Sequence, residues 1–253
     1  MSLEVQRGGA VVVLVLSREE KRNALSSELV RRLADEVERA GADPSVRGIV
    51  LTATGEVFAS GGDLDEFAGM LEAPDAAERV LEMGERLRVL ERAEVPVVAA
   101  VAGDVFGGGC ELLLLCDVIV AEPQARFGFR HAAMGLSPAW GGGSRLVERV
   151  GRGMAARLLY AAEAIDAERA AQIGFVTELA PRGGALGWAT KYVERVAKND
   201  RAAVAAQKRL LGELHRAMRG DAEAREAEAF RELWAGPSHR AAMERFAERR
   251  RPT

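Results

Sequence analysis

Short apolar runs alternate with longer amphipathic segments over about the first 180 residues of the chain. Runs rich in Val, Ile and Ala predict strands, and their nearly continuous apolar character is typical of buried parallel strands at 10–17, 48–54, 95–103 and 117–122. Residues 26–41 predict a helix, because serines can cap its start and Gly41 ends the amphipathic pattern. This alternation indicates an α/β fold assembled from β-β-α or β-α-β units.

The pattern changes near residue 184. From there to residue 253 the chain is rich in Ala, Glu and Arg, and no segment has the pattern of a strand. We therefore expect two regions, a mixed core at 1–183 and a helical layer at 184–253 that packs on this core or on another subunit. Residues 66–87 predict a further amphipathic helix, and 151–156 predict a turn between two helices.

The composition suits one sizeable globular domain, or a domain with a smaller appendage, because 48% of the 253 residues are hydrophobic and 29% are charged. A net charge of -3 provides no uniform positive field for nucleic acid. The longest apolar runs are shorter than the about 20 residues that a membrane-spanning helix needs. The first residues lack a charged segment followed by an apolar signal core, so we expect a cytoplasmic protein.

The cysteines and two of the three histidines fit structural positions. Cys110 and Cys116 lie in one predicted helix and are expected to be reduced core residues. His215 and His239 fall in the charged helical region, where we expect a solvated face. The chain has no P-loop, no HExxH sequence and no CxxC pair, so neither a phosphate-binding loop nor a metal site is predicted.

Two glycine-containing turns, 57–67 and 105–117, each follow a predicted strand. Consecutive glycines at the junction of a strand and a helix expose backbone N–H groups at the positive end of the helix dipole, where negative charge is stabilised. Glu111 falls in the first turn of the helix that is predicted to begin within the second of these segments. An acid in this position can exchange protons with a substrate whose oxygen the N–H groups hold, although a plain tight turn is the alternative.

Six motifs with these turns among them occur in order along the chain: NAL (23–25), FASGGDL (58–64), GGGCEL (107–112), CD (116–117), GLSPAWGGGSRL (135–146) and RFAERRRP (245–252). Together they resemble the enoyl-CoA hydratase/isomerase, or crotonase, superfamily. The resemblance implies an α/β spiral of ββα units, followed by helices that build a homotrimer, often paired into a hexamer. It implies an acyl-CoA thioester as substrate. No other cofactor is expected, because backbone donors stabilise a thioester enolate.

The resemblance also implies roles for individual residues. The backbone N–H groups of Ser60 and Gly108 would form the oxyanion hole. Coenzyme A would be bound by residues near the phosphates, the adenine and the adenine-side loop, namely Arg18, Lys21, Arg22, Ala24, Leu25 and Asp63. The tail at 245–253 would cover coenzyme A, often on a neighbouring subunit. A solvated loop and a frayed charged end are the alternatives for these basic segments.

His131 stands where hydratases of the family have a second glutamate beside the one that Glu111 matches. Hydration uses a water held between two carboxylates, and histidine cannot supply the same anionic pair. The window 125–150 is closer to ethylmalonyl-CoA decarboxylases, in which a histidine precedes Met-Gly and a Pro-x-Trp-Gly-Gly run. We therefore expect His131 and Glu111 to be catalytic. A neutral histidine that satisfies a backbone carbonyl is the structural alternative.

Three functions follow from these residues. The preferred prediction is decarboxylation of a 2-alkylmalonyl-CoA, such as ethylmalonyl- or methylmalonyl-CoA. The first alternative is an enoyl-CoA hydratase or isomerase of fatty-acid metabolism, and the second is a non-catalytic acyl-CoA-binding scaffold. Trp140 is expected to line the acyl pocket or to be purely structural, and the helix at 66–87 to move over the acyl chain or to be a plain surface helix.

Overall fold

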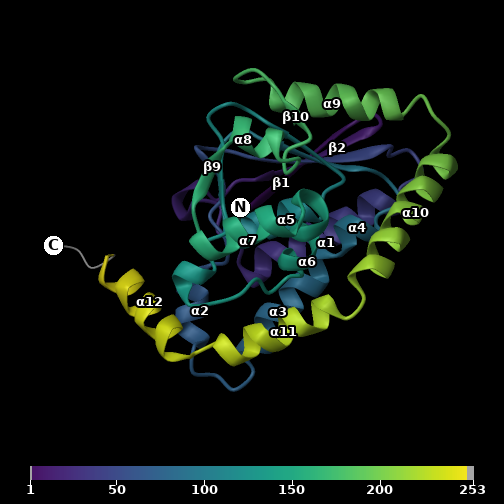
Figure 1. Cartoon of the computed structure of the whole chain (residues 1–253). Coiled ribbons are helices and arrows are strands. Elements are labelled where there is room, and N and C mark those ends of the chain that lie inside the picture. The colour runs from purple at the N-terminus through teal and green to yellow at the C-terminus, as the bar shows by residue number, and fades with distance from the viewer. Residues whose placement is uncertain (1, 250–253) are drawn as a thin grey trace.

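A computed structural model describes residues 2–249 of the chain (Figure 1). A six-stranded sheet within these residues has the strand order β1 (Leu3–Gly8), β2 (Val11–Leu16), β3 (Gly48–Ala53), β5 (Val97–Val101), β7 (Val118–Ala121) and β10 (Glu178–Leu179). β1 is antiparallel to β2, and the other neighbours are parallel. The four strands expected from apolar runs are all present, each with ends within two residues of the expected ones.

A second, four-stranded sheet has the order β4 (Val57–Ala59), β6 (Asp104–Phe106), β8 (Arg126–Gly128) and β9 (Ala164–Asp166). The first three of its strands are parallel, and each directly follows a strand of the large sheet. The chain therefore passes from the large sheet to the small one and then into helical segments, and repeats this path. This is the spiral of ββα units that the motifs imply.

The helices of the core region are α1 (Ser27–Ala42), α2 (Leu64–Met70), α3 (Ala76–Leu87), α4 (Val89–Arg92), α5 (Gly108–Leu114), α6 (Gly142–Val150), α7 (Arg152–Ala161) and α8 (Ala167–Gln172). Two short 3-10 helices are η1 (Glu19–Lys21) and η2 (Ala132–Met134). Four more follow: α9 (Ala185–Val196), α10 (Arg201–Arg219), α11 (Ala222–Leu233) and α12 (Pro237–Glu248). None of the helices in the described residues is long and apolar enough to cross a membrane.

Successive side chains along each strand point to opposite faces of the large sheet, and a hydrophobic core lies on each face. Val50 of β3 and Val98 of β5 face α9, where Val193 is fully buried. Ile49 and Leu51 of β3 point to the other face and join the larger core with α1 and α5. Figure 1 shows α9 on one side of the sheet, α10 descending beside the molecule, and α11 and α12 crossing the opposite side.

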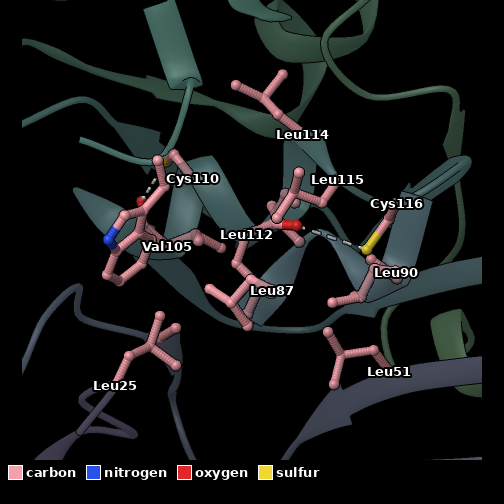
Figure 2. Packing of buried hydrophobic residues seen from close by; sticks show 14 of the residues in the cluster. Leu25, Leu51, Leu87, Leu90, Val105, Cys110, Leu112, Leu114, Leu115 and Cys116 are labelled. Carbon is pink, nitrogen blue, oxygen red and sulfur yellow. Dashed lines mark hydrogen bonds between the residues drawn. The ribbon is translucent and has the colours of Figure 1, made fainter. Parts of the chain in front are cut away.

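Both cysteines are free and buried in the larger core around α5, as expected (Figure 2). The Cys110 thiol donates to the carbonyl of Val105 at 3.2 Å, and Cys116, just beyond the helix, donates to Leu112 at 3.7 Å. Burial raises the pKa of the Cys110 thiol, and it raises the pKa of Cys116 to about 12. Both thiols are therefore poor nucleophiles at neutral pH.

Three local expectations are corrected. Helix α1 continues through Gly41 and ends at Ala42. The single helix expected at 66–87 is two helices, α2 and α3, separated by a turn that contains Pro74, which has no N–H for a helical hydrogen bond. His239 is fully buried instead of solvated, because its face of α12 packs on η2.

Candidate active site

A cavity of about 160 Å³ opens beside the turns that follow β4 and β6. Its wall combines backbone of both turns with apolar side chains and a few polar groups: Ser60, Gly61, Gly62, Leu64, Phe67, Val80, Gly107, Gly108, Glu111, Arg130, His131, Met134, Leu136, Ala139, Trp140 and Phe230. An apolar pocket with a few convergent polar groups is typical of a small-molecule site. Phe230 belongs to α11, so the C-terminal region helps to enclose the cavity.

The two glycine turns meet because β4 and β6 are parallel neighbours, so their carboxyl ends lie at one edge of the small sheet. Gly61 has φ +108°, a conformation that a side chain rarely allows. A Cβ atom on Gly61 would lie 3.2 Å from the carbonyl oxygen of Phe106 and 3.4 Å from the nitrogen of Gly108. Glycine therefore lets the two turns approach each other closely.

The structure does not support Ser60 as an oxyanion donor, because its N–H already donates to the carbonyl of Arg22 at 3.1 Å. Leu25 instead donates to the carbonyl of Gly61 at 2.8 Å. In a trans peptide the N–H points opposite to the C=O, so the next N–H, that of Gly62, points away from Leu25. Gly62 also lines the cavity. Its N–H replaces that of Ser60 as the candidate donor of the first turn.

Gly108 remains the candidate donor of the second turn. It is the first residue of α5, and the N–H groups at a helix start have no partner in the preceding turn. Within the described residues, the N–H groups of Gly62 and Gly108 donate to no acceptor. Both residues line the cavity, where a substrate oxygen can accept both hydrogen bonds.

Glu111 is 1% exposed and faces the same cavity from the first turn of α5. Its Oε2 atom accepts hydrogen bonds from the backbone N–H of Trp140 at 2.8 Å and of Gly142 at 3.0 Å. Its Oε1 atom lies 2.9 Å from Nε2 of His131 and 3.4 Å from the N–H of Ala139. The start of α6 thus holds one carboxylate oxygen, while the other contacts a proton-exchanging side chain.

His131 comes from the segment between β8 and η2, and its side chain is 12% exposed. Its Nδ1 atom is buried and has no hydrogen-bond partner within the described residues. The imidazole and the carboxylate were predicted to act together, and the fold brings them into direct contact although they lie 20 residues apart. The alternative in which a backbone carbonyl satisfies His131 does not describe this contact.

Trp140 is 3% exposed and lies at the cavity wall. Its Nε1–H donates to the carbonyl of Val80 at 2.8 Å, which fixes the ring against α3. A Cβ atom on Gly108 would lie 2.6 Å from this ring, so only glycine leaves room for the indole beside the start of α5. Trp140 therefore combines a structural contact with a position on the pocket wall.

The basic segment at 18–25 packs against the start of α2. Arg18 pairs with Asp63 at 2.5 Å, and Lys21 pairs with Asp65 at 2.6 Å. Asp63 is 4% exposed and also caps α2 by accepting the N–H groups of residues 65 and 66. Ala24 and Leu25 are buried, whereas Arg22 is exposed and forms no ion pair within residues 2–249.

Asn23 organises this segment, although no role was predicted for it. Its side chain is fully buried and donates to the carbonyls of Thr54 and Val57 at 2.9 and 2.7 Å, while its oxygen accepts the N–H of Arg18 at 2.7 Å. These contacts hold the loop beside β4. The available signal in the sequence was the Asn of the NAL motif, a residue type that tolerates the left-handed backbone conformation seen here, with φ +51°.

The family model of enoyl-CoA hydratase/isomerase matches residues 6–253. The chain belongs to this family. It is 33% identical to the 2,3-dehydroadipyl-CoA hydratase of Escherichia coli K12, over 99% of this chain and 97% of that protein. It is 32% identical to a short-chain-enoyl-CoA hydratase of Clostridium acetobutylicum, over 98% and 95%.

Solved structures of the enoyl-CoA hydratase/isomerase family share this fold. The crystal structure of a Pseudoalteromonas atlantica member superposes with a TM-score of 0.87 at 32% identity, and the match covers 100% of this chain and 99% of that one. A methylmalonyl-CoA decarboxylase also has a TM-score of 0.87, with coverage of 100% and 98%, but its 23% identity shows a common fold alone.

Membership of the family makes this chain an acyl-CoA enzyme of the crotonase superfamily, not a non-catalytic scaffold. The named relatives favour the hydratase alternative over the decarboxylation that the window 125–150 predicted. The last residues of the basic tail, 250–253, lie outside the described residues. Among the residues that the structure describes, no group of three His, Cys, Asp or Glu side chains is arranged to hold a metal ion.

Proposed function

We propose that this enzyme adds water to the double bond of a 2-enoyl-CoA thioester. The observation that carries the proposal is the Glu111–His131 contact of 2.9 Å in a cavity that the Gly62 and Gly108 N–H groups also line. A thioester oxygen that accepts both N–H groups leaves its acyl chain in the cavity with the carboxylate. Hydratases among the relatives support the same reaction class.

The proposed step begins when Oε1 of Glu111 accepts a proton from water, and the resulting hydroxide forms a bond to the β carbon. The electrons of the double bond move toward the thioester oxygen, which becomes the oxyanion of an enolate. The N–H groups of Gly62 and Gly108 stabilise that negative charge. The enolate then takes at its α carbon the proton that the Glu111–His131 pair gained from water, which returns Glu111 to its carboxylate form and gives a 3-hydroxyacyl-CoA.

His131 takes the place of the second carboxylate in this proposal. Nε2 lies within hydrogen-bond distance of Oε1, so a proton can pass between the two groups during the cycle. The backbone donors from Trp140 and Gly142 keep Oε2 occupied and leave Oε1 as the reactive atom. One carboxylate with a histidine partner thus supplies both the base and the acid.

The test is mass spectrometry of the purified protein incubated separately with crotonyl-CoA, methylmalonyl-CoA and ethylmalonyl-CoA. We expect a gain of 18 Da on crotonyl-CoA, the mass of one water, and a loss of this activity by about 100-fold or more in Glu111→Gln. Glu66→Gln, a change outside the cavity wall, is the matched control and should retain turnover. An unchanged rate in Glu111→Gln contradicts the mechanism.

Decarboxylation of a 2-alkylmalonyl-CoA is the second candidate, and the presence of His131 in place of a second carboxylate favours it. The bond from the α carbon to the carboxylate would break, CO2 would leave, and the same N–H groups would hold the enolate. The Glu111–His131 pair would then deliver a proton to the α carbon. Loss of 44 Da from either malonyl thioester, with crotonyl-CoA unchanged, would establish this reaction instead.

The acyl group is proposed to be short, because the cavity of about 160 Å³ is bounded by Phe67, Trp140 and Phe230. For coenzyme A we propose that Lys21 and Arg22 lie near its phosphates and that the backbone of Ala24 and Leu25 lies near its adenine. Arg18 and Asp63 form an ion pair with each other, and we propose that this pair stabilises the conformation of the segment.

We propose a homotrimer, or a dimer of such trimers, as the assembly. Support comes from α10, where Leu210, Leu211, Leu214 and Met218 are 54–76% exposed on a single helix. Large apolar side chains gathered in this way are typical of an interface between subunits.

A further inference from the structure

Helix α11 brings a second carboxylate to the helix start that holds Glu111. Oε2 of Glu226 accepts the N–H of Gly143 at 3.1 Å, and Oε1 accepts the N–H of Ser144 at 2.6 Å. The N–H groups around the start of α6 thus bind two carboxylates. Those of Trp140 and Gly142 donate to Glu111 of α5, and those of Gly143 and Ser144 donate to Glu226 of α11.

The two carboxylates lie against adjacent glycines. A Cβ atom on Gly142 would lie 2.5 Å from Cγ of Glu111, and one on Gly143 would lie 3.3 Å from the carboxyl carbon of Glu226. Burial raises the pKa of Glu226; hydrogen bonds from Ser144 oppose this rise and the charge of Glu111 adds to it. The two groups therefore interact electrostatically although Glu226 does not line the cavity.

A nearby cation, Arg145, interacts with Glu226 electrostatically but forms its ion pairs with other carboxylates. Arg145 of α6 is bound by Glu91 of α4 at 2.6 Å and by Glu223 of α11 at 3.0 Å. Glu223 in turn pairs with Arg88, which follows α3, at 2.5 Å and with Arg219 of α10 at 3.0 Å. Within the described residues Glu226 forms hydrogen bonds to α6 but no ion pair.

We infer that Glu226 is a positioning residue for the reaction, which acts through the start of α6 on the charge of the Glu111–His131 pair. A fixed negative charge nearby stabilises the protonated forms of both partners. It also withdraws two N–H donors that would otherwise add to the positive end of α6. Docking of α11 thereby sets the pH range in which the pair exchanges protons. The link to catalysis rests on the proposed function, whereas the electrostatic coupling itself does not.

The test measures the coupling and the reaction separately. Nuclear magnetic resonance of protein with ¹⁵N-labelled histidine follows the titration of His131, with the exposed His215 as an internal reference. The pH profile of kcat on crotonyl-CoA is recorded in parallel. Removal of a negative charge destabilises the protonated pair, so in Glu226→Gln we expect the titration midpoint of His131 and the acid limb of kcat to move to lower pH by about half a unit.

Two further variants separate charge from packing. Glu226→Asp retains the charge and should keep the midpoint of His131 close to that of the unmodified enzyme. Glu228→Gln removes an equal charge from an exposed position on the same helix, and should leave both readouts unchanged. A midpoint in Glu226→Gln that moves no further than in Glu228→Gln overturns the inference, as does a fall in kcat that is uniform at all pH values.

The two proposals fail in distinguishable ways. If the unmodified enzyme does not hydrate crotonyl-CoA, the proposed function is wrong, and a shifted His131 midpoint in Glu226→Gln still supports the coupling. If crotonyl-CoA is hydrated but the midpoint does not move, the proposed function stands and the role of Glu226 is overturned.

Discussion

At the scale of single residues, Glu111 is fixed by its neighbours more than by its own helix. Backbone donors from Trp140 and Gly142 fill one oxygen, and His131 contacts the other. A carboxylate held in this way pays little orientational cost when a substrate arrives. The position of the Glu111 carboxylate therefore depends on residues such as Gly142, which has no reactive side chain.

Gly142→Ala should abolish most of the activity without unfolding the protein. The added Cβ atom would lie 2.5 Å from both Cγ and Oε2 of Glu111, so the carboxylate must move. A displacement of about 1 Å at a catalytic group costs on the order of 100-fold, and we expect a loss of this size in kcat on crotonyl-CoA. Gly153→Ala is the control, since nothing lies within 4 Å of its Cβ position. Wild-type kcat in Gly142→Ala would refute this view of the site.

The residue types of the site could be predicted from the sequence, but which backbone N–H of the first glycine turn faces the cavity could not. Glu111 and His131 carry recognisable chemistry in recognisable motifs, and they lie in contact. The choice between the N–H groups of Ser60 and Gly62 depends on hydrogen bonds to Arg22 and Leu25, more than 30 residues away. A motif fixes which residues are present, and distant partners fix which of their backbone groups are available.

At the scale of elements, α12 docks on the core through a buried histidine. His239 is fully buried, and its Nδ1 atom lies 2.9 Å from the carbonyl of Met134 in η2, so the neutral ring donates there. Nε2 is buried without a hydrogen-bond partner in the described part of the chain. The element that follows His131, a candidate catalytic residue, thus contacts a titratable group from the C-terminal region.

Acidification should loosen this contact. Burial lowers the pKa of His239, and the hydrogen bond to Met134 offsets part of the decrease. The unfolded chain then binds more protons than the folded chain below about pH 6.5, so stability present above that pH is lost as the pH falls through the folded-state pKa. We expect the melting temperature to fall by about 2–4 °C between pH 7 and pH 5 on this account.

Differential scanning calorimetry of two matched variants checks the assignment. His239→Asn retains a donor for the Met134 carbonyl but no titration in this range, so its melting temperature should be lower at pH 7 and less dependent on pH. His215→Asn changes an exposed histidine and should leave the pH dependence intact. If the melting temperature of His239→Asn depends on pH as strongly as that of the unmodified protein, groups other than His239 cause the loss of stability at low pH.

Elements were predictable where both faces are buried. The central strands β3, β5 and β7 are continuous apolar runs, and the structure places them as expected. β1 was not predicted, because it is an edge strand whose residues after Leu3 are mostly polar and exposed. The buried face of α12 was not predicted for a related reason, since its composition is that of a surface helix and only three of its residues are buried.

At the scale of the whole molecule, helix α10 leaves four large apolar side chains exposed, those of Leu210, Leu211, Leu214 and Met218. If the proposed trimer forms, Leu214→Glu should weaken it, because a buried carboxylate without a partner opposes association. Light scattering coupled to size-exclusion chromatography should show a shift from trimer toward monomer. Glu213→Gln, at the neighbouring position, is the control. A monomeric unmodified protein would disprove the proposed assembly.

The overall architecture could be predicted from the order of the motifs, but the packing of the C-terminal helices against the cavity could not. The ββα spiral is present as expected, and within the described residues the segment after β10 forms the four helices α9 to α12. Local patterns did not reveal that α11 returns to the cavity wall with Phe230, or that Glu226 reaches α6. Such contacts join segments about 80 residues apart and arise from the packing of charged helices, whose sequences specify no single partner.

The contribution of α11 to the cavity has a consequence for synthesis. A ribosome adds residues in order, so the turns, Glu111 and His131 can assemble well before Phe230 and Glu226 have emerged from the exit tunnel. The wall of the cavity is therefore completed only near the end of translation. A nascent core that is already folded would still have this cavity open on the side that α11 later covers.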